Sequence, residues 1–138
     1  MIQNLRHVGI PIRDIELALG FYVGLLGFKV ICQKTIEGEY AEKLFGISKM
    51  KLTYIKLQLD SDTTLLELHF YHCPTYMHPM TMHHFAFSVT DLDMEYKRLS
   101  DSGIQFVSEP LKAPDSNCRI AFCFDPNGNM VELVEENK

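Results

Sequence analysis

One short pattern occurs twice along this chain of 138 residues. In each half a histidine opens an apolar stretch, an aspartate follows seven residues later, and a glutamate lies inside a later apolar stretch. These residues are His7, Asp14 and Glu67 in the first half and His84, Asp91 and Glu132 in the second. Packing accounts for the apolar residues, but not for polar residues at matching positions. The pattern therefore predicts two copies of one supersecondary unit.

The spacing of apolar residues predicts the same order of elements in both halves. The first half should contain a strand over 5–12, a helix over 15–26, and strands over 28–33, 51–59 and 65–71. The second should contain a strand over 83–89, a helix over 91–102, and strands over 104–108, 119–124 and 129–135. Asp14 and Asp91 suit the N-caps of the two helices, and residues 60–63 suit a turn. Residues 34–50 have no clear period and could hold a loop with a short helix.

This order predicts an α+β fold in which two βαβββ modules form a cupped mixed sheet. The modules should span about 1–72 and 82–138. Residues 73–81 contain Pro74 and Pro79 and are typical of a linker. At this length the whole chain, 1–138, is expected to be a single domain.

Composition restricts the classes of function. Hydrophobic residues make up 46% of the chain, which is ordinary for a globular protein and excludes disorder. A formal charge of −5 gives no reason to expect nucleic-acid binding. Neither a membrane span nor a signal pattern is found, so we expect no membrane partner. The scattered cysteines are expected to be reduced thiols, and the expected location is cytoplasmic.

Strand alternation tests whether the repeated polar residues can converge. Successive side chains of a strand point to opposite faces, so His7 shares a face with Gly9 and lies opposite the bulky apolar residues of its strand. The same holds for Glu67, His84 and Glu132 in their own strands. All four therefore point away from the apolar residues next to them in sequence, as expected for side chains that line a pocket.

Two imidazoles and two carboxylates form a mixed nitrogen and oxygen ligand set. Such a set suits one Zn²⁺, Ni²⁺, Co²⁺, Mn²⁺ or Fe²⁺ ion, and it leaves octahedral positions open for water or substrate. We therefore expect a divalent metal bound by His7, Glu67, His84 and Glu132. The alternative to this metal site is that the unit was duplicated and that one half then lost its function.

Two other side chains have open roles. His69 follows Glu67 by two residues on the same face, so it is either a rim residue or a group that enters the pocket as a second-shell or acid–base residue. Tyr54 lies in an alternating strand and either contacts a substrate or lines a core.

The residues resemble those of a known family. The paired His–strand–Asp–helix openings, the LELHFY and HHFAFSVTDL segments and the closing FDPNGNMVELVE segment are similar to the vicinal oxygen chelate superfamily. That superfamily includes glyoxalase I, methylmalonyl-CoA epimerase, extradiol dioxygenases, fosfomycin-resistance enzymes and bleomycin-resistance proteins. The resemblance covers roughly residues 5–135.

The resemblance implies a metal whose open positions bind vicinal oxygens of a small substrate and stabilise an enolate-type intermediate. Its four metal positions match His7, Glu67, His84 and Glu132, a set similar to that of bacterial-type glyoxalase I. In that enzyme Glu132 would also be the base that moves a proton between adjacent carbons, and Glu67 could serve the opposite face of the substrate. The chain departs from glyoxalase I at 69–71, where His-Phe-Tyr replaces Thr-Tyr-Asn.

Three classes of function follow from the resemblance. The filled ligand positions favour a glyoxalase I-like lyase or isomerase acting on a small molecule. The alternatives are an extradiol-type dioxygenase or thiol-transferring resistance enzyme, and a binding protein that sequesters a drug. Because each module leaves half a pocket, the modules are expected to pair, within one chain or across a homodimer.

Overall fold

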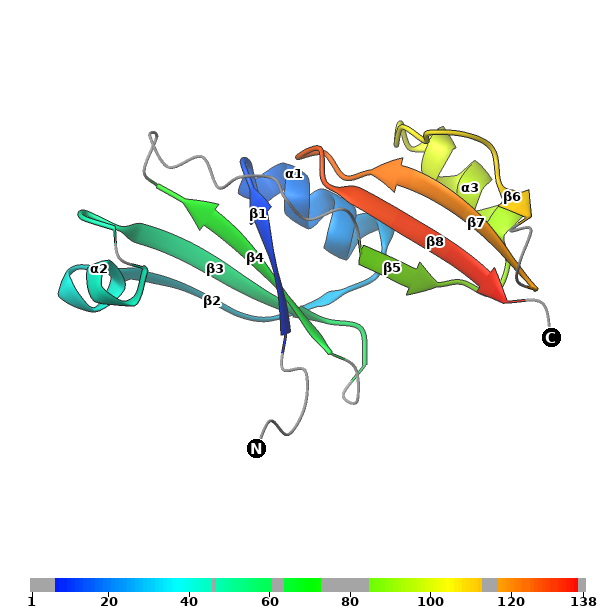
Figure 1. Cartoon of the computed structure of the whole chain (residues 1–138). Coiled ribbons are helices and arrows are strands. Elements are labelled where there is room, and N and C mark those ends of the chain that lie inside the picture. Colours follow the sequence, from blue (N-terminus) through cyan, green and yellow to red (C-terminus); the bar gives the residue numbers. More distant parts are fainter. Residues whose placement is uncertain (1–6, 46, 61–63, 73–84, 113–116, 137–138) are drawn as a thin grey trace. The chain divides into compact units, whose positions relative to one another are not determined.

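The computed structural model describes residues 7–45, 47–60, 64–72, 85–112 and 117–136 (Figure 1). The chain divides into two compact units, Met1–Met80 and Thr81–Lys138. The predicted linker over 73–81 lies outside the described residues, as does His84. The single-domain prediction therefore stays a prediction.

The first unit contains seven elements in the described part of the chain. They are β1 (His7–Ile12), α1 (Ile15–Leu19), the π-helix η1 (Gly20–Leu25), β2 (Lys29–Glu37), α2 (Glu39–Phe45), β3 (Lys51–Gln58) and β4 (Leu65–Tyr71). The predicted helix over 15–26 is thus an α-helical turn continued by a π-helical one. The Leu26 N–H donates to the Phe21 carbonyl, five residues back, at 3.0 Å. The helix ends before Gly27, whose φ of +80° suits glycine.

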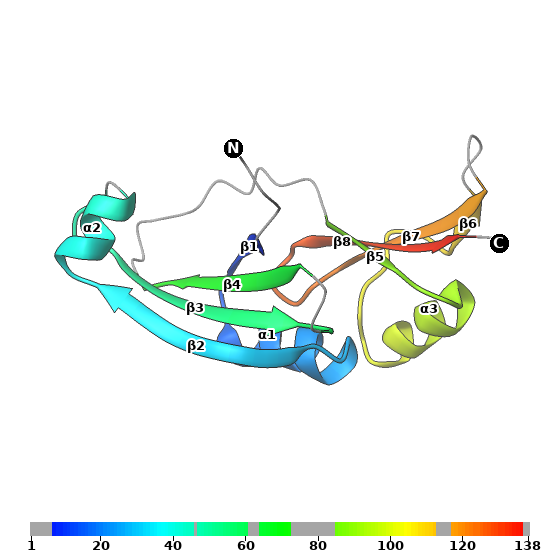
Figure 2. The ribbon, with the colours of Figure 1, turned by 90° about the horizontal axis from the view of Figure 1, so that it is seen from below.

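The four strands of this unit form a mixed sheet in the order β1-β4-β3-β2 (Figures 1 and 2). Strand β1 pairs with β4 in parallel, and β3 pairs antiparallel with both β4 and β2. The parallel pair joins the first and last strands of the unit. Side chains that are far apart in sequence therefore become neighbours on this sheet.

The two faces of the first sheet differ in chemistry. One face carries the main apolar core, which contains the buried strand residues Ile10, Ile12, Ile55, Leu57, Leu66 and Leu68. The opposite face carries Glu67. A smaller core of Ala41, Met50 and Leu52 covers the far end of that face, where α2 connects β2 to β3 (Figure 2). The polar residues around Glu67 thus lie on a sheet whose back is well packed.

The second unit repeats this topology. It contains β5 (Phe85–Ser88), α3 (Leu92–Asp101), β6 (Leu111–Lys112), β7 (Cys118–Phe124) and β8 (Met130–Glu136). The strand order is β5-β8-β7-β6, with β5 parallel to β8 and the other pairs antiparallel. Helix α3 packs on β7 and β8, and the core includes Leu92, Leu99, Ala121, Cys123, Val131 and Leu133. The predicted α+β class and the duplicated module are both confirmed.

The predicted strand over 104–108 is wrong as a regular strand. Among the described residues this stretch forms one isolated bridge, between Phe106 and Cys123. The edge position belongs instead to the two residues of β6. The chain bends after Phe106, and Pro110 has no N–H to donate to a ladder, so pairing with β7 does not continue beyond this bridge as a regular strand.

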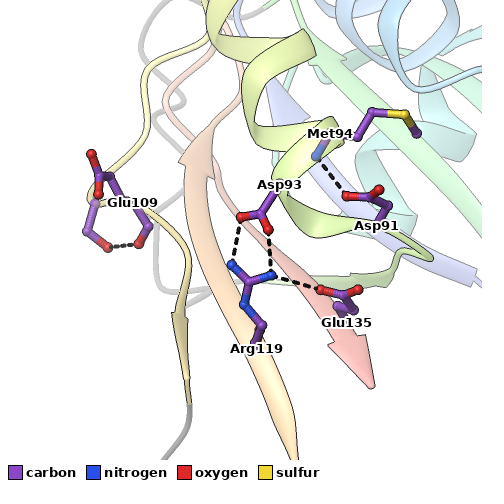
Figure 3. Close-up of polar contacts among 7 residues, drawn as sticks. Asp91, Asp93, Met94, Glu109, Arg119 and Glu135 are labelled. Atoms are coloured by element: carbon purple, nitrogen blue, oxygen red, sulfur yellow. Dashed lines mark hydrogen bonds and ion pairs between the residues drawn. The ribbon is translucent and has the colours of Figure 1, made fainter. Parts of the chain in front are cut away.

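The repeated aspartates are N-caps, as predicted. The Leu17 N–H donates to Asp14 Oδ1 and the Met94 N–H donates to Asp91 Oδ1, each at 2.9 Å. Figure 3 shows the second cap beside a surface ion pair, in which Arg119 of β7 donates to both carboxylate oxygens of Asp93 in α3, at 2.6 and 2.7 Å. The aspartate of the repeated pattern thus has a structural role.

Among the described residues, no helix combines the length and apolar character needed to cross a bilayer.

We predict that Asp91→Ala lowers the free energy of unfolding by about 1 kcal/mol, because it leaves an orphan N–H at the start of α3. Asp91→Ser should recover most of this loss, since its hydroxyl can accept the same hydrogen bond. Urea unfolding followed by circular dichroism measures both. Equal losses for the two variants would contradict a capping role.

Three of the four cysteines lie in the described part of the chain, and Cys32, Cys118 and Cys123 are there as thiols rather than in disulfides. Burial raises the pKa of the Cys123 thiol to about 12, and the charge of Asp125 adds to the effect. We predict that iodoacetamide at pH 8 modifies Cys32 and Cys118 in the native protein but modifies Cys123 only after unfolding, because the thiolate is the reactive form. Peptide mass spectrometry checks this, and native labelling of Cys123 would contradict it.

Candidate functional site

The candidate site of the first unit is a group of four side chains on one face of its sheet, His7, Lys56, Glu67 and His69, which we call the Glu67 cluster. Strand register places them together. Glu67 in β4 lies between Gly9 of β1 and Lys56 of β3. One step along the same face, His69 lies between Pro11 and Tyr54.

Glu67 is the centre of this cluster. Its Oε2 atom lies 2.9 Å from His69 Nε2 and 3.3 Å from His7 Nε2, and its Oε1 atom lies 3.5 Å from Lys56 Nζ. The residue is only 8% exposed. A buried carboxylate without partners costs several kcal/mol, so these nitrogen groups are what permits a charge at this position.

The electrostatics of Glu67 follow from two opposing effects. Burial on its own would raise the pKa of the carboxyl group. The hydrogen bond from His69 and the charges of His7, His69 and Lys56 act in the other direction and outweigh it, so the pKa lies below its usual value. Glu67 is therefore an ionised carboxylate at neutral pH, which is the form that binds a metal.

His69 is held in place by three neighbours. The first is Glu67. The second is Tyr71, whose hydroxyl lies 3.4 Å from His69 Nδ1 and whose ring meets the His69 ring edge to face. The third neighbour is Gly9, where an added Cβ would come within 2.9 Å of His69 Cε1. Of the two interpretations open from sequence, the structure supports direct contact with Glu67 rather than a rim position.

The spacing of His7 and Glu67 fits two ligands of one metal ion. Donor atoms that each lie about 2.1 Å from a metal, at tetrahedral or octahedral angles, are roughly 3.0–3.4 Å from each other. The observed 3.3 Å between His7 Nε2 and Glu67 Oε2 falls in this range. His7 Nδ1 is buried and has no hydrogen-bond partner among the described residues. The usual second-shell acceptor of a metal-bound histidine is therefore not found in that part of the chain.

The second unit carries Glu132 at the equivalent position. Glu132 in β8 lies between Ala86 of β5 and Phe122 of β7, as Glu67 lies between Gly9 and Lys56. It is half-buried. His84, the partner expected from the repeat, lies outside the described residues. In the described part of the chain, no group of three or more His, Cys, Asp or Glu residues has the arrangement of a complete metal site. The four-ligand set thus stays a prediction.

Sequence reasoning missed Lys56. The predicted hairpin could have placed Lys56 opposite Glu67, because Lys56 lies four residues before Asp60 and Glu67 lies four residues after Thr63. Residues at equal distances from the two ends of a hairpin turn oppose one another. The ammonium group of Lys56 also lies 5.5 Å from the ring centre of Tyr54.

A second polar chain lies on the opposite face of the same sheet. Thr53 Oγ1 is 2.7 Å from Thr35 Oγ1 and 2.7 Å from His72 Nε2. Strand alternation places Thr53 away from Glu67. This chain therefore joins neighbouring strands and is separate from the Glu67 cluster.

We predict that Gly9→Ala lowers the free energy of unfolding by about 1–2 kcal/mol, because the new methyl group would displace His69 from Glu67. The loss should largely disappear in a His69→Ala background, since the clashing ring is then absent. Gly24→Ala is the control, because a Cβ there meets open space. Urea unfolding of the four variants gives the coupling free energy between Gly9→Ala and His69→Ala. Losses in the free energy of unfolding that simply add in the double variant would contradict the contact between position 9 and the His69 ring.

Comparisons with known proteins agree with this fold. The sequence model of the Glyoxalase/Bleomycin resistance protein/Dioxygenase superfamily matches residues 4–133. A probable lactoylglutathione lyase of Synechocystis is 27% identical over 133 residues, which are 95% of this chain and 94% of the relative.

Two solved structures show the same fold. A glyoxalase family protein of Bacillus cereus superposes with a TM-score of 0.84 at 20% identity, covering 100% of this chain and 97% of that one. An antibiotic-binding protein of a Streptomyces species superposes with a TM-score of 0.71 at 24% identity, covering 99% and 98%. The matched length, the duplicated topology and the equivalent glutamates lead to one conclusion: the chain belongs to the glyoxalase/bleomycin resistance/dioxygenase superfamily.

Proposed function

We propose that this protein is a divalent-metal-dependent lyase or isomerase of the glyoxalase I type, acting on a small molecule with vicinal oxygens. The observation that carries the proposal is the pairing of His7 with the ionised Glu67 at the separation of two metal ligands. The proposed ligands are His7, Glu67, His84 and Glu132. The proposed ion is Zn²⁺, Ni²⁺, Co²⁺, Mn²⁺ or Fe²⁺.

The two glutamates have different surroundings, and this supports different roles. Glu67 is restrained by three nitrogen groups, which suits a ligand that stays in place. Glu132 is half-buried, and its cross-strand neighbours are Ala86 and Phe122 rather than a glycine and a lysine. We therefore assign the proton transfer between adjacent carbons to the Glu132 carboxylate. Glu67 would face the other side of the substrate.

The metal would supply Lewis acidity, which lowers the energy of negative charge on the substrate oxygens. The protein's own contribution would be orientation and proton transfer. Glu132 would take a proton from one carbon and return it to the next, and general base catalysis of this kind contributes roughly 100- to 10,000-fold to a rate. His69 would keep the Glu67 carboxylate oriented through the 2.9 Å hydrogen bond.

The comparisons favour this chemistry over the alternatives. Relatives named lactoylglutathione lyase match along nearly the whole chain, among them one of Neisseria meningitidis at 27% identity over 135 residues. The ionised and well-held Glu67 adds to this, since a pocket that only sequesters a drug needs no metal ligand. The expected homodimer and small-molecule partner belong to the same proposal.

We predict that the purified protein loses its activity on treatment with a chelator and regains it with Ni²⁺ or Zn²⁺. The assay screens hemithioacetals, acyl-CoA thioesters and catechols, with dissolved oxygen recorded in parallel. Glu132→Gln should lower kcat at least 100-fold. Glu136→Gln is the matched control, because it removes the same charge from the exposed end of the same strand.

The alternatives give different results in the same screen. Recovery with Fe²⁺ alone, together with oxygen uptake, would replace the proposal by a dioxygenase. Absence of bound metal after purification without chelator would refute both enzyme assignments.

A further inference from the structure

A row of three polar side chains follows strand β4 on the face that carries Glu67. Glu67, His69 and Tyr71 alternate along the strand, so their side chains lie on the same side of the sheet. Two hydrogen bonds join them. His69 Nε2 lies 2.9 Å from Glu67 Oε2, and His69 Nδ1 lies 3.4 Å from the Tyr71 hydroxyl. Both ring nitrogens of His69 therefore have partners within one strand.

The direction of these hydrogen bonds follows from the ionised Glu67. A carboxylate only accepts, so the proton of the shorter bond belongs to His69 Nε2. Nδ1 of a neutral imidazole is then an acceptor, and the Tyr71 hydroxyl is the donor beside it. The hydrogen bond at one ring nitrogen sets which nitrogen carries the proton. Tyr71 thereby favours the form of His69 whose N–H points at Glu67.

Tyr71 is itself held by apolar packing. Its ring is partly buried against the small core of Ala41, Met50 and Leu52, where α2 covers the sheet. It also meets the His69 ring edge to face, with 6.1 Å between the ring centres. The hydroxyl is therefore carried by a restrained ring, which makes it a suitable support for the imidazole.

The duplicated unit shows that the fold does not need this row. The second unit keeps the glutamate, but the positions equivalent to His69 and Tyr71 hold Val134 and Glu136. Val134 has no polar side-chain atom and Glu136 is exposed. The same topology thus forms without an imidazole and a phenol at these positions. Packing of the module therefore does not account for His69 and Tyr71.

We propose that Tyr71 is a positioning residue, which acts through His69 to fix the orientation of the Glu67 carboxylate. This inference rests on the proposed function, because a fixed carboxylate matters for a residue that binds a metal and faces a substrate. Hydrogen-bond partners of metal ligands typically contribute roughly 10- to 100-fold to metal affinity or activity. The Tyr71 contact is the longer of the two, so the loss of its hydroxyl should have an effect at the lower end of this range.

The first test observes the two His69 nitrogens by NMR, in the full-length protein labelled with ¹⁵N-histidine. Tyr71→Phe keeps the ring but removes the hydroxyl. It should shift the Nδ1 resonance, which loses its donor, and also the Nε2 resonance, because the bond to Glu67 becomes less ordered. His69→Gln identifies the signals. An Nε2 resonance that stays as in the unmodified protein would overturn the inference, since the contact with Glu67 would then not depend on Tyr71.

Tyr40→Phe is the matched control for both tests. It removes the same hydroxyl from a tyrosine of α2 that is 66% exposed. The His69 resonances and the activity of this variant should equal those of the unmodified protein.

The second test measures kcat and KM of the Ni²⁺-loaded protein with the hemithioacetal of glutathione and methylglyoxal. Tyr71→Phe should lower kcat roughly tenfold and change KM less than twofold, because it disturbs orientation rather than substrate binding. In a His69→Gln background the same substitution should lower kcat by less than about twofold, since the path from Tyr71 to Glu67 is already interrupted. Equal losses of kcat in the two backgrounds would contradict an action through His69.

The two tests separate failure of the inference from failure of the proposed function. If the unmodified protein converted neither this hemithioacetal nor the other compounds of the screen, the proposed function would fail. The NMR comparison would then still decide whether Tyr71 positions Glu67. If the unmodified protein were active but Tyr71→Phe left kcat unchanged, only the inference would fail.

Discussion

The site of this protein depends on one buried negative charge. Glu67 lies on the face of the first sheet opposite the main apolar core, with 8% of its surface exposed, and its carboxylate contacts nitrogen atoms of His7, Lys56 and His69. Burial opposes ionisation, and these three groups overcome that opposition. The constraint explains the neighbours as well, because Gly9 has no side chain and so leaves room for the His69 ring.

The duplicated topology gives the two glutamates equivalent positions in chemically different surroundings. Gly9 and Lys56 flank Glu67, whereas Ala86 and Phe122 flank Glu132. Duplication supplies two carboxylates on equivalent strands, and divergence of their cross-strand neighbours allows separate tasks. In the proposed function, Glu67 is a metal ligand and Glu132 also transfers the proton. This asymmetry is the reason why the proposed function assigns proton transfer to Glu132 rather than to Glu67.

Much of the fold could be predicted from the sequence, since periodicity and caps are local properties. Both helix starts at Asp14 and Asp91 were predictable, because an N-cap needs only its own side chain and the next turn of backbone. The strand over 104–108 was not, because a strand exists only where a partner pairs with it, and here one bridge at Phe106 replaces a ladder. Whether a segment forms a strand therefore depends on tertiary contacts, whereas an N-cap depends on neighbouring residues in the sequence.

The sequence by itself determined the duplication, the module topology and the face on which His7 and Glu67 lie, because strand alternation has a fixed period of two. Tertiary structure decided what surrounds Glu67. The parallel pairing of β1 with β4 brings His7 Nε2 to 3.3 Å from the Glu67 carboxylate. The role of His69 was open from the sequence, and its packing against Gly9 and Tyr71 places it in direct contact with Glu67. Distances between side chains depend on register and rotamers across several strands, and local sequence patterns do not encode these.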